Sequence, residues 1–239
     1  MAYTRAQVRS LVQQRCDIEN ATHQQNSEFN NHINDAARYV HDFLISTYGN
    51  RYALKTEQFL TTAGVSDYHL ETVTGVVTGN LINDCYRVAS VKLRVDDIDY
   101  PLGSYEDMDG PRYNSSQSWG PGYLPEYLVH YDLDSTSDII FSPKPDAAYT
   151  ILLQYHPVAP EYTSDSAVVS LPHVDLLVIE ACIRAKDKEE RDASRFMQER
   201  ALIQKRIEDW ASPVDHANPP QTIRAAGGGR AIWRRERVF

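Results

Sequence analysis

The chain lacks the features that identify membrane, secreted and disulfide-linked proteins. No apolar run in its 239 residues approaches the roughly 20 residues that a helix needs to span a bilayer. The opening MAYTRAQVRS holds no apolar segment of the kind that directs secretion. Cys16, Cys85 and Cys182 are an odd number at wide spacing, which excludes a disulfide framework and a cysteine metal cluster. We therefore expect a protein made in the cytoplasm, with no membrane partner.

Motifs for catalysis and cofactor binding are also missing. The run Gly227–Gly229 follows no expected strand and precedes no Lys-Ser or Lys-Thr pair, so it is no phosphate loop. His32 and His41 share an expected helix, but they lie nine residues apart instead of the single turn that a zinc site uses. Ser, Cys and His show no local nucleophile signature. We expect no enzyme, no cofactor and no metal, and we interpret the histidines as surface or core residues.

The acidic segments do not form a calcium loop. Residues 132–138 carry oxygen-bearing side chains at alternating positions, but glycine is missing at the sixth position, and Pro143 stands where a calcium loop needs glutamate. We interpret this segment as a polar β-turn. The segments 96–99 and 106–109 likewise indicate solvated loops.

Charge is divided unevenly along the chain. The net charge is −9, yet residues 217–239 carry five arginines and one glutamate, a balance of +4, which leaves −13 on residues 1–216. A body this acidic repels nucleic acid, because phosphate binding requires lysine and arginine. Only the basic C-terminal segment suits an acidic partner.

Helical periodicity marks both ends of the body. Residues 4–18 predict a helix that Thr4 caps together with Gln7. A second helix opens at Ser27, and Gly49 stands where a left-handed helix stop is expected. The short polar connection between these helices favours an antiparallel hairpin. Two more helices are expected, one from Pro172 and one that carries an apolar stripe from 196 to 210.

The middle of the chain has strand periodicity. Alternating runs at 86–95, 126–132, 138–142 and 148–156 are separated by turn-forming residues, and 103–122 reads as a long exposed loop. Twelve of the fifteen tyrosines lie between residues 50 and 170, as expected for strands that bury a ring and keep its hydroxyl wet. These features predict antiparallel meanders that close into a small barrel or sandwich.

The fold class is therefore α+β, with the β region inserted into a four-helix unit. We divide the chain into an N-terminal helical hairpin (1–50), a β-rich insert (51–170), a C-terminal helical pair (171–211) and an extended arm (212–239). In the arm, Pro219-Pro220 excludes a helix and Gly227–Gly229 adds backbone freedom. Apolar anchors then alternate with arginines, a pattern typical of a segment that orders on a partner. We expect the partner-binding residues to be Ile223, Arg224, Arg230, Ile232, Trp233, Arg234, Arg235, Arg237, Val238 and Phe239.

Three stretches carry a family resemblance. The first is TRAQVR from Thr4, which leads into SEFNNHINDAA from Ser27. The second is IIFSPKPDAAYT from Ile139, with QYHPVAP from Gln154 shortly after it. The third is the helical pair at 172–210 with the arm behind it. These stretches resemble the head-to-tail adaptor (connector) proteins of tailed bacteriophages, particularly those of short-tailed phages. Together they extend over nearly the whole chain, apart from residues 61–125.

The resemblance implies a structural virion protein of the neck. Such adaptors form rings, usually of twelve copies, between the portal protein above and a tail or nozzle protein below. It further implies that the helices form the ring wall, that genomic DNA passes through the lumen without sequence-specific binding, and that the C-terminal segment reaches onto the portal. The acidic body and basic arm of this chain suit those tasks.

Two other functions stay open on the sequence alone. In one, the β region is a recognition module for carbohydrate or a host surface, with an aromatic platform made of Tyr113, Trp119, Tyr123, Tyr127 and Tyr131. The plainer interpretation puts these rings in the β core or in the contact between ring subunits. In the other, chain folding assembles an enzyme site from residues far apart in the sequence. Whether the free protein is monomeric is also left open.

Overall fold

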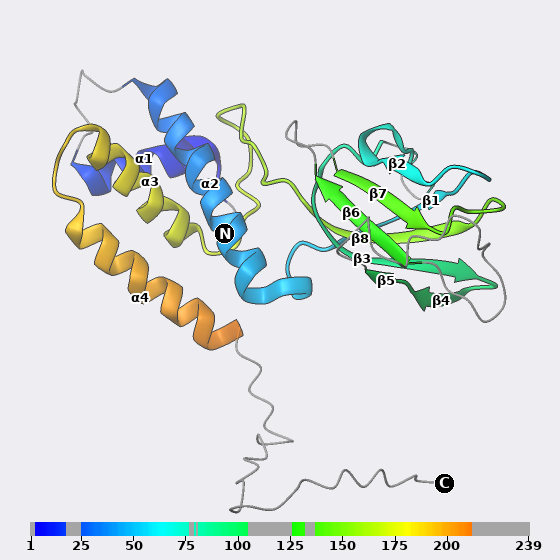
Figure 1. Cartoon of the computed structure of the whole chain (residues 1–239). Helices are drawn as coiled ribbons and strands as arrows, with labels where there is room; N and C mark the ends of the chain where they lie inside the picture. The colour runs from blue at the N-terminus through cyan, green and yellow to red at the C-terminus, as the bar shows by residue number, and fades with distance from the viewer. Residues whose placement is uncertain are drawn as a thin grey trace, which may run out of the picture.

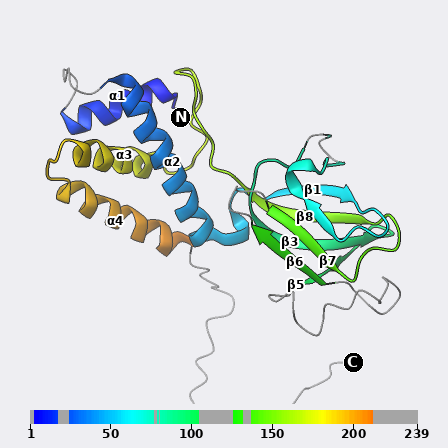
Figure 2. The same cartoon turned by 45° about the horizontal axis from the view of Figure 1, so that its top comes forward.

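The computed structural model describes residues 3–17, 25–76, 79, 81–104, 126–131 and 137–211, and for 126–131 it describes the backbone alone. Within these ranges the chain forms a helical body and a β body that lie side by side (Figures 1 and 2). The helical body holds α1 (Arg5–Cys16), α2 (Asn26–Tyr48), α3 (Val174–Lys188) and α4 (Ser194–Ala211). All strands fall between α2 and α3 in the chain, which confirms the α+β class.

The ends of the N-terminal helices follow from local chemistry. The Thr4 hydroxyl accepts from the Gln7 backbone N–H, and the Gln7 side chain accepts from the Thr4 N–H at 2.9 Å, so the predicted capping box is confirmed. At the end of α2, Gly49 has a φ of 53° but a ψ of −134°. The expected left-handed stop is therefore wrong: Gly49 instead opens the 3₁₀ turn η1 (Gly49–Arg51).

The third helix starts later than its proline suggests. His173 has φ 58° and ψ 51°, a left-handed conformation that a helix cannot include, so α3 begins at Val174 instead of Pro172. The prediction rested on the preference of proline for the first turn of a helix, but Pro172 lies two residues before α3 begins.

Strands form two four-stranded sheets in the described residues. The first has the order β1 (Lys55–Leu60), β8 (Thr150–Pro157), β3 (Cys85–Val95) and β4 (Ile98–Pro101), all antiparallel. The second has the order β2 (Asp67–His69), β7 (Ser137–Ser142), β6 (Glu126–Tyr131) and β5 (Gly103–Ser104). In it, β5 runs parallel to β6, which corrects the expectation of antiparallel pairing throughout. Residues 105–125, which connect β5 to β6, lie outside the described ranges.

One core joins the two sheets. Phe59 of β1 and Tyr68 of β2 have ring centroids 5.6 Å apart, and Tyr68 contacts Phe141 of β7 at the same separation. Val91, Leu93, Ile151 and Leu153 complete this core from β3 and β8. Val91 and Leu93 of β3, and Ile151 and Leu153 of β8, are alternate residues that point between the sheets, which is the sandwich form of the prediction.

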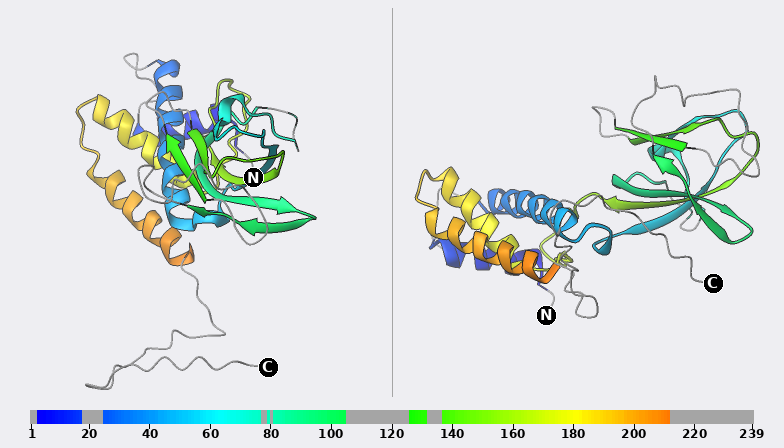
Figure 3. Two further views of the ribbon diagram at one scale, coloured as in Figure 1. Left: turned by 45° about the vertical axis from the view of Figure 1, so that its right-hand side comes forward. Right: turned by 60° about the horizontal axis from the view of Figure 1, so that its bottom comes forward.

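A second core fills the helical body. Val8, Phe29, Leu44 and Leu177 are buried there together with Phe196 and Ile207 of α4. Tyr162, Val169 and Leu171 also belong to this core, although they precede α3 in the connection from β8. The chain thus crosses between the bodies after α2 and returns after β8, and the returning segment packs against the helices (Figure 3).

Candidate interaction surfaces

The predicted partner-binding residues all belong to the arm. Ile223, Arg224 and the eight named positions from Arg230 to Phe239 lie outside the described residues. The structure describes the place from which the arm starts, the end of α4 at Ala211.

Two contacts fix the root of the arm. The Arg51 guanidinium donates through Nη2 to the carbonyl oxygen of Ala211 at 2.9 Å. The ring of Trp210 lies 6.4 Å from the ring of His173, with the two planes 37° apart. Arg51 ends the turn after α2, and His173 precedes α3. The arm therefore leaves the helical body where the ends of three helices meet.

A buried ion pair attaches α4 to the rest of the body. Glu180 of α3 is 4% exposed, and its Oε2 accepts from Arg200 Nη1 of α4 at 2.8 Å. The Arg200 guanidinium also lies over the ring of Tyr39 in α2, 5.4 Å from its centroid. The hydrogen bond to Glu180 raises the pKa of Arg200 above its ordinary value, which keeps the charge fixed. Because Arg184 Nε lies 3.2 Å from Glu180 Oε1, a second cation helps to compensate this buried carboxylate.

A cluster of two arginines and one aspartate docks α1. Arg5 donates to the Tyr162 carbonyl at 2.8 Å and to Asp165 at 2.6 Å. Arg9 donates hydrogen bonds to both carboxylate oxygens of Asp165, at 2.8 and 2.9 Å, and to the side-chain oxygen of Asn30 in α2 at 2.9 Å. The hydrogen bonds from Arg9 and then Arg5 hold the pKa of Asp165 far below its usual range. Sequence reasoning missed this cluster, because its members are 156 residues apart and no local pattern links them.

Hydrogen bonds through Tyr52 join the two bodies. His41 of α2 has Nε2 2.8 Å from the carbonyl oxygen of Pro157, which only accepts, so Nε2 donates. Its Nδ1 then accepts from the Tyr52 hydroxyl at 3.1 Å. The carbonyl of Tyr52 in turn accepts from His156 Nδ1 at 3.1 Å. Burial raises the pKa of Tyr52 to about 12, and burial is also the main cause that lowers the pKa of His156.

An open groove runs along this junction, next to the root of the arm. Its wall includes Tyr52 and Ala53, which follow Arg51, and Pro172, which precedes His173. Asp84 and Glu161 supply carboxylates to the same groove. Asp84 is already paired, with the Lys55 ammonium and with the Tyr155 hydroxyl at 2.9 Å. The groove therefore offers a mainly apolar surface with two carboxylates, and the carboxylate of Asp84 is already neutralised.

The aromatic platform considered for the recognition module is described only in part. Tyr113, Trp119 and Tyr123 lie outside the described residues, as does the 103–122 loop beyond β5. Tyr127 and Tyr131 belong to β6, four residues apart and so on one face of that strand. Nothing in the described backbone favours a sugar site over the plainer interpretation.

The acidic segments take ordinary structural places. Asp138 lies in β7 with Oδ1 2.7 Å from Nδ1 of His69, while residues 132–136 of the same segment lie outside the described ranges. Asp99 pairs with Arg94 through two hydrogen bonds of 2.7 and 3.2 Å. No group of three metal-binding side chains occurs in the part of the chain that the structure describes. Within that part, no helix has the length and apolar character needed to cross a membrane.

Comparison with known families gives one match. Residues 3–224 match a family model described as "SU10 adaptor protein". The matched range starts before α1, includes both bodies and extends past the end of α4. No protein with a curated description matches the chain.

Proposed function

Because the chain belongs to the SU10 adaptor protein family, we propose that it assembles into a ring that docks under the portal of a phage capsid and joins this vertex to the tail. The family makes it a structural adaptor of a bacteriophage, in the neck of the virion. The observation that carries the proposal is the extent of the match, which takes in the helical body, the β body and the start of the arm.

The charge of the chain supports a role as part of a DNA channel. Residues 1–216 carry −13 of formal charge, and DNA gains no counterion release from binding to such a surface. A ring of these bodies lets DNA slide through its lumen without holding it. This is the passage without sequence-specific binding that the family resemblance implies.

The arm supplies the contact with the portal. Its root is fixed by Arg51 and by the ion pair of α4 with Glu180, so a firm base carries the anchoring residues. Trp233 and Phe239 supply apolar anchors, and the arginines can bind portal carboxylates in a bidentate manner. In a ring of the twelve copies that the family resemblance implies, modest arm affinities add up through effective concentration. The tail or nozzle protein binds on the opposite side.

The proposed division of labour follows the two cores. We assign the ring wall and portal binding to the helical parts, residues 1–50 and 171–211, and to the arm, 212–239. The β-rich part, 51–170, faces outward or towards the tail. Its last ten residues pack against the helices. We assign the protein a structural role and no catalytic activity.

The test is the mass of the purified protein, alone and after mixing with a matching portal ring. We expect multiple copies to join each portal ring, as measured by sedimentation velocity and by mass photometry. A chain of 27.2 kDa makes each added copy easy to count. A protein that ignores the portal would overturn the proposal, and a saccharide titration of tryptophan fluorescence would then test the recognition module.

A further inference from the structure

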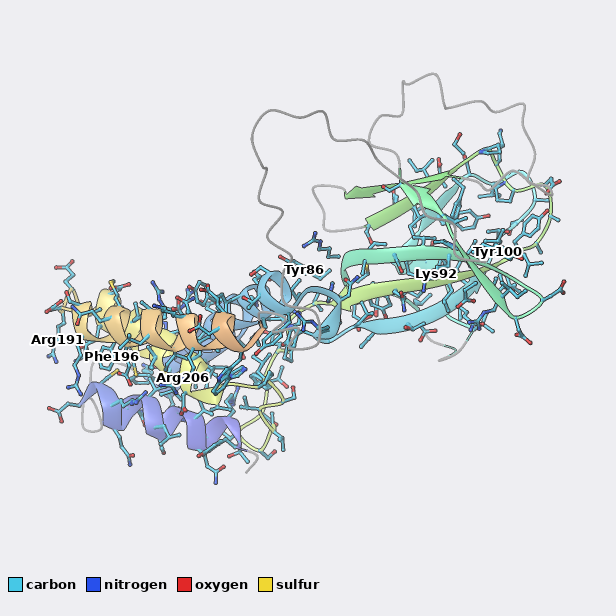
Figure 4. All side chains as sticks on the ribbon, turned by 90° about the horizontal axis from the view of Figure 1, so that it is seen from below. Tyr86, Lys92, Tyr100, Arg191, Phe196 and Arg206 are labelled. Atoms are coloured by element: carbon cyan, nitrogen blue, oxygen red, sulfur yellow. The ribbon has the colours of Figure 1, made fainter. Side chains whose placement is uncertain are left out.

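The outward face of α4 carries an unpaired basic and apolar patch. Leu202 is 68% exposed, and Arg195 and Arg206 lie on the same face of the helix, seven residues before it and four after it. Phe196 of the same helix is buried in the helical core, whereas Arg206 is exposed; Figure 4 labels both. Arg195, Lys205 and Arg206 have no ion pair within the described ranges. We call Arg195, Leu202, Lys205 and Arg206 the α4 patch.

The tip of the β3–β4 hairpin carries a patch of the opposite charge. Asp96 and Asp97 form the two-residue turn, with φ of 50° and 63°, a conformation that Asp and Asn accept more readily than most residues. Ile98 is 56% exposed, and the exposed Val95 is its partner across the hairpin. Both turn aspartates are exposed and have no ion pair among the described residues, whereas Asp99 is neutralised by Arg94. We call Val95, Asp96, Asp97 and Ile98 the hairpin patch.

The two patches are complementary but cannot meet within one chain. Each has an exposed aliphatic centre with unpaired charges beside it. The charges are negative in the hairpin patch and mainly positive around Leu202, where Arg195, Lys205 and Arg206 outnumber the exposed Asp209. Figures 1 and 4 show that they lie at opposite ends of the molecule, α4 on the helical body and β4 at the far edge of the β body. A basic patch stands out on a body of formal charge −13, because the rest of the surface repels an acidic partner.

Two different patches that bind each other between copies make a heterologous contact, which builds a ring when the rotation from one copy to the next closes. We propose that the hairpin patch of one copy packs on the α4 patch of the next copy, with Ile98 against Leu202 and with Asp96 and Asp97 facing Arg195 and Arg206. This contact rests on the ring of the proposed function and names the surfaces that form it. It also explains why the most exposed leucine of the described helices lies beside cations instead of in the core.

Cysteine cross-linking tests the contact directly. Full-length I98C and L202C proteins, mixed on a matching portal ring, will form cross-linked pairs with a short bismaleimide, whereas neither variant will cross-link alone. The doubly substituted chain will give a ladder of multimers. As a control, V168C replaces a residue with 56% exposure on the connection before α3 and will not cross-link to L202C.

Charge variants give an independent measure. We expect R195E/R206E and D96N/D97N each to raise the dissociation constant of self-association at least tenfold, because each removes one side of the complementary charge. Asn keeps the turn geometry at positions 96 and 97. The control R38E changes the charge on the exposed face of α2, where Arg38 makes only a surface ion pair, and will leave assembly unchanged.

The outcomes separate this contact from the proposed function. Rings that form on the portal without I98C–L202C cross-links, or that tolerate both charge variants, would overturn the contact and leave the adaptor function standing. Cross-links from L202C to portal protein would also overturn it, since the α4 patch would then bind the portal. If no copies join the portal at all, while I98C and L202C still cross-link in solution, the contact stands and portal docking fails.

Discussion

Asp165 carries more of the architecture than its place in a connecting segment suggests. It receives hydrogen bonds from both Arg5 and Arg9, and these two residues belong to the first helix of the chain. Arg9 also reaches Asn30, so one aspartate ties α1 and, through Arg9, α2 to the connection that leads into α3. Loss of this carboxylate would leave the partly buried Arg5 with the Tyr162 carbonyl as its remaining partner.

We expect Asp165→Asn to lower the melting temperature at neutral pH. The pKa of Asp165 is depressed in the folded protein, so its contribution is present above the unfolded value of about 4 and is lost as pH falls through the folded value. The difference in melting temperature between wild type and variant should therefore shrink below about pH 4. Differential scanning calorimetry at several pH values measures it.

Glu161→Gln is the matched control, because Glu161 is an exposed carboxylate four residues earlier in the same connection, with no ion pair in the described residues. Equal melting temperatures for the two variants at pH 7 would show that the arginine cluster contributes nothing to stability.

At this scale, the sequence could predict only interactions between near neighbours. The Thr4–Gln7 box is visible because its two members are three residues apart. The Arg9–Asp165 pair is not, since nothing in the spacing of charges selects Asp165 over the other acidic residues of the chain. Gly49 shows a subtler limit, because a glycine predicts a positive φ but leaves ψ open.

Among the elements, α4 has the most direct bearing on function, because the arm starts from its end. Its contacts with the body include Phe196, Ile207 and the Arg200–Glu180 pair, which all lie before Ser212. Stability and portal binding should therefore be separable.

Deleting residues 219–239 should leave the melting curve unchanged and abolish co-sedimentation with the portal ring. In the full-length chain, replacing Trp233 and Phe239 by Ala should reproduce most of this loss, because buried aromatic anchors usually dominate interfaces. Replacing Arg230 by Ala is the milder comparison. A truncated protein that still binds the portal normally would show that the arm is not the anchor.

Helices and long strands were predictable from periodicity, whereas pairing was not. The four expected helices are confirmed, with starts and ends shifted by a few residues. The parallel pairing of β5 with β6 depends on the path of the chain between them, which no alternation of apolar residues specifies. For the same reason, periodicity indicated a barrel or a sandwich without distinguishing them.

For the whole molecule, the junction between the bodies decides whether they move as one. The described contacts include the Tyr52 hydroxyl on His41 and the His41 ring on the Pro157 carbonyl. Tyr52 follows the helical hairpin and Pro157 ends β8, so these hydrogen bonds link the outgoing and the returning chain. An adaptor that holds a tail in a fixed orientation relative to the portal needs a rigid connection between its two bodies.

We expect Tyr52→Phe to lower the free energy of unfolding by about 1 kcal/mol, because Nδ1 of the buried His41 loses its donor. Small-angle scattering should also show a wider range of distances between the bodies. Tyr48→Phe is the control: Tyr48 packs on the same helical core, and its hydroxyl has no hydrogen bond in the described structure. Identical scattering from all three proteins would mean that the hydrogen bond does not restrain the bodies.

The two crossings between the bodies also have a consequence for how such a protein can change. Lys55 at the start of β1 pairs with Tyr155 near the end of β8. The chain therefore enters the β body and leaves it again through two adjacent strands. A segment whose two ends are neighbours can be exchanged as a cassette without altering the scaffold that receives it. One helical scaffold could thereby carry different β cassettes and fit the same vertex to unlike tails.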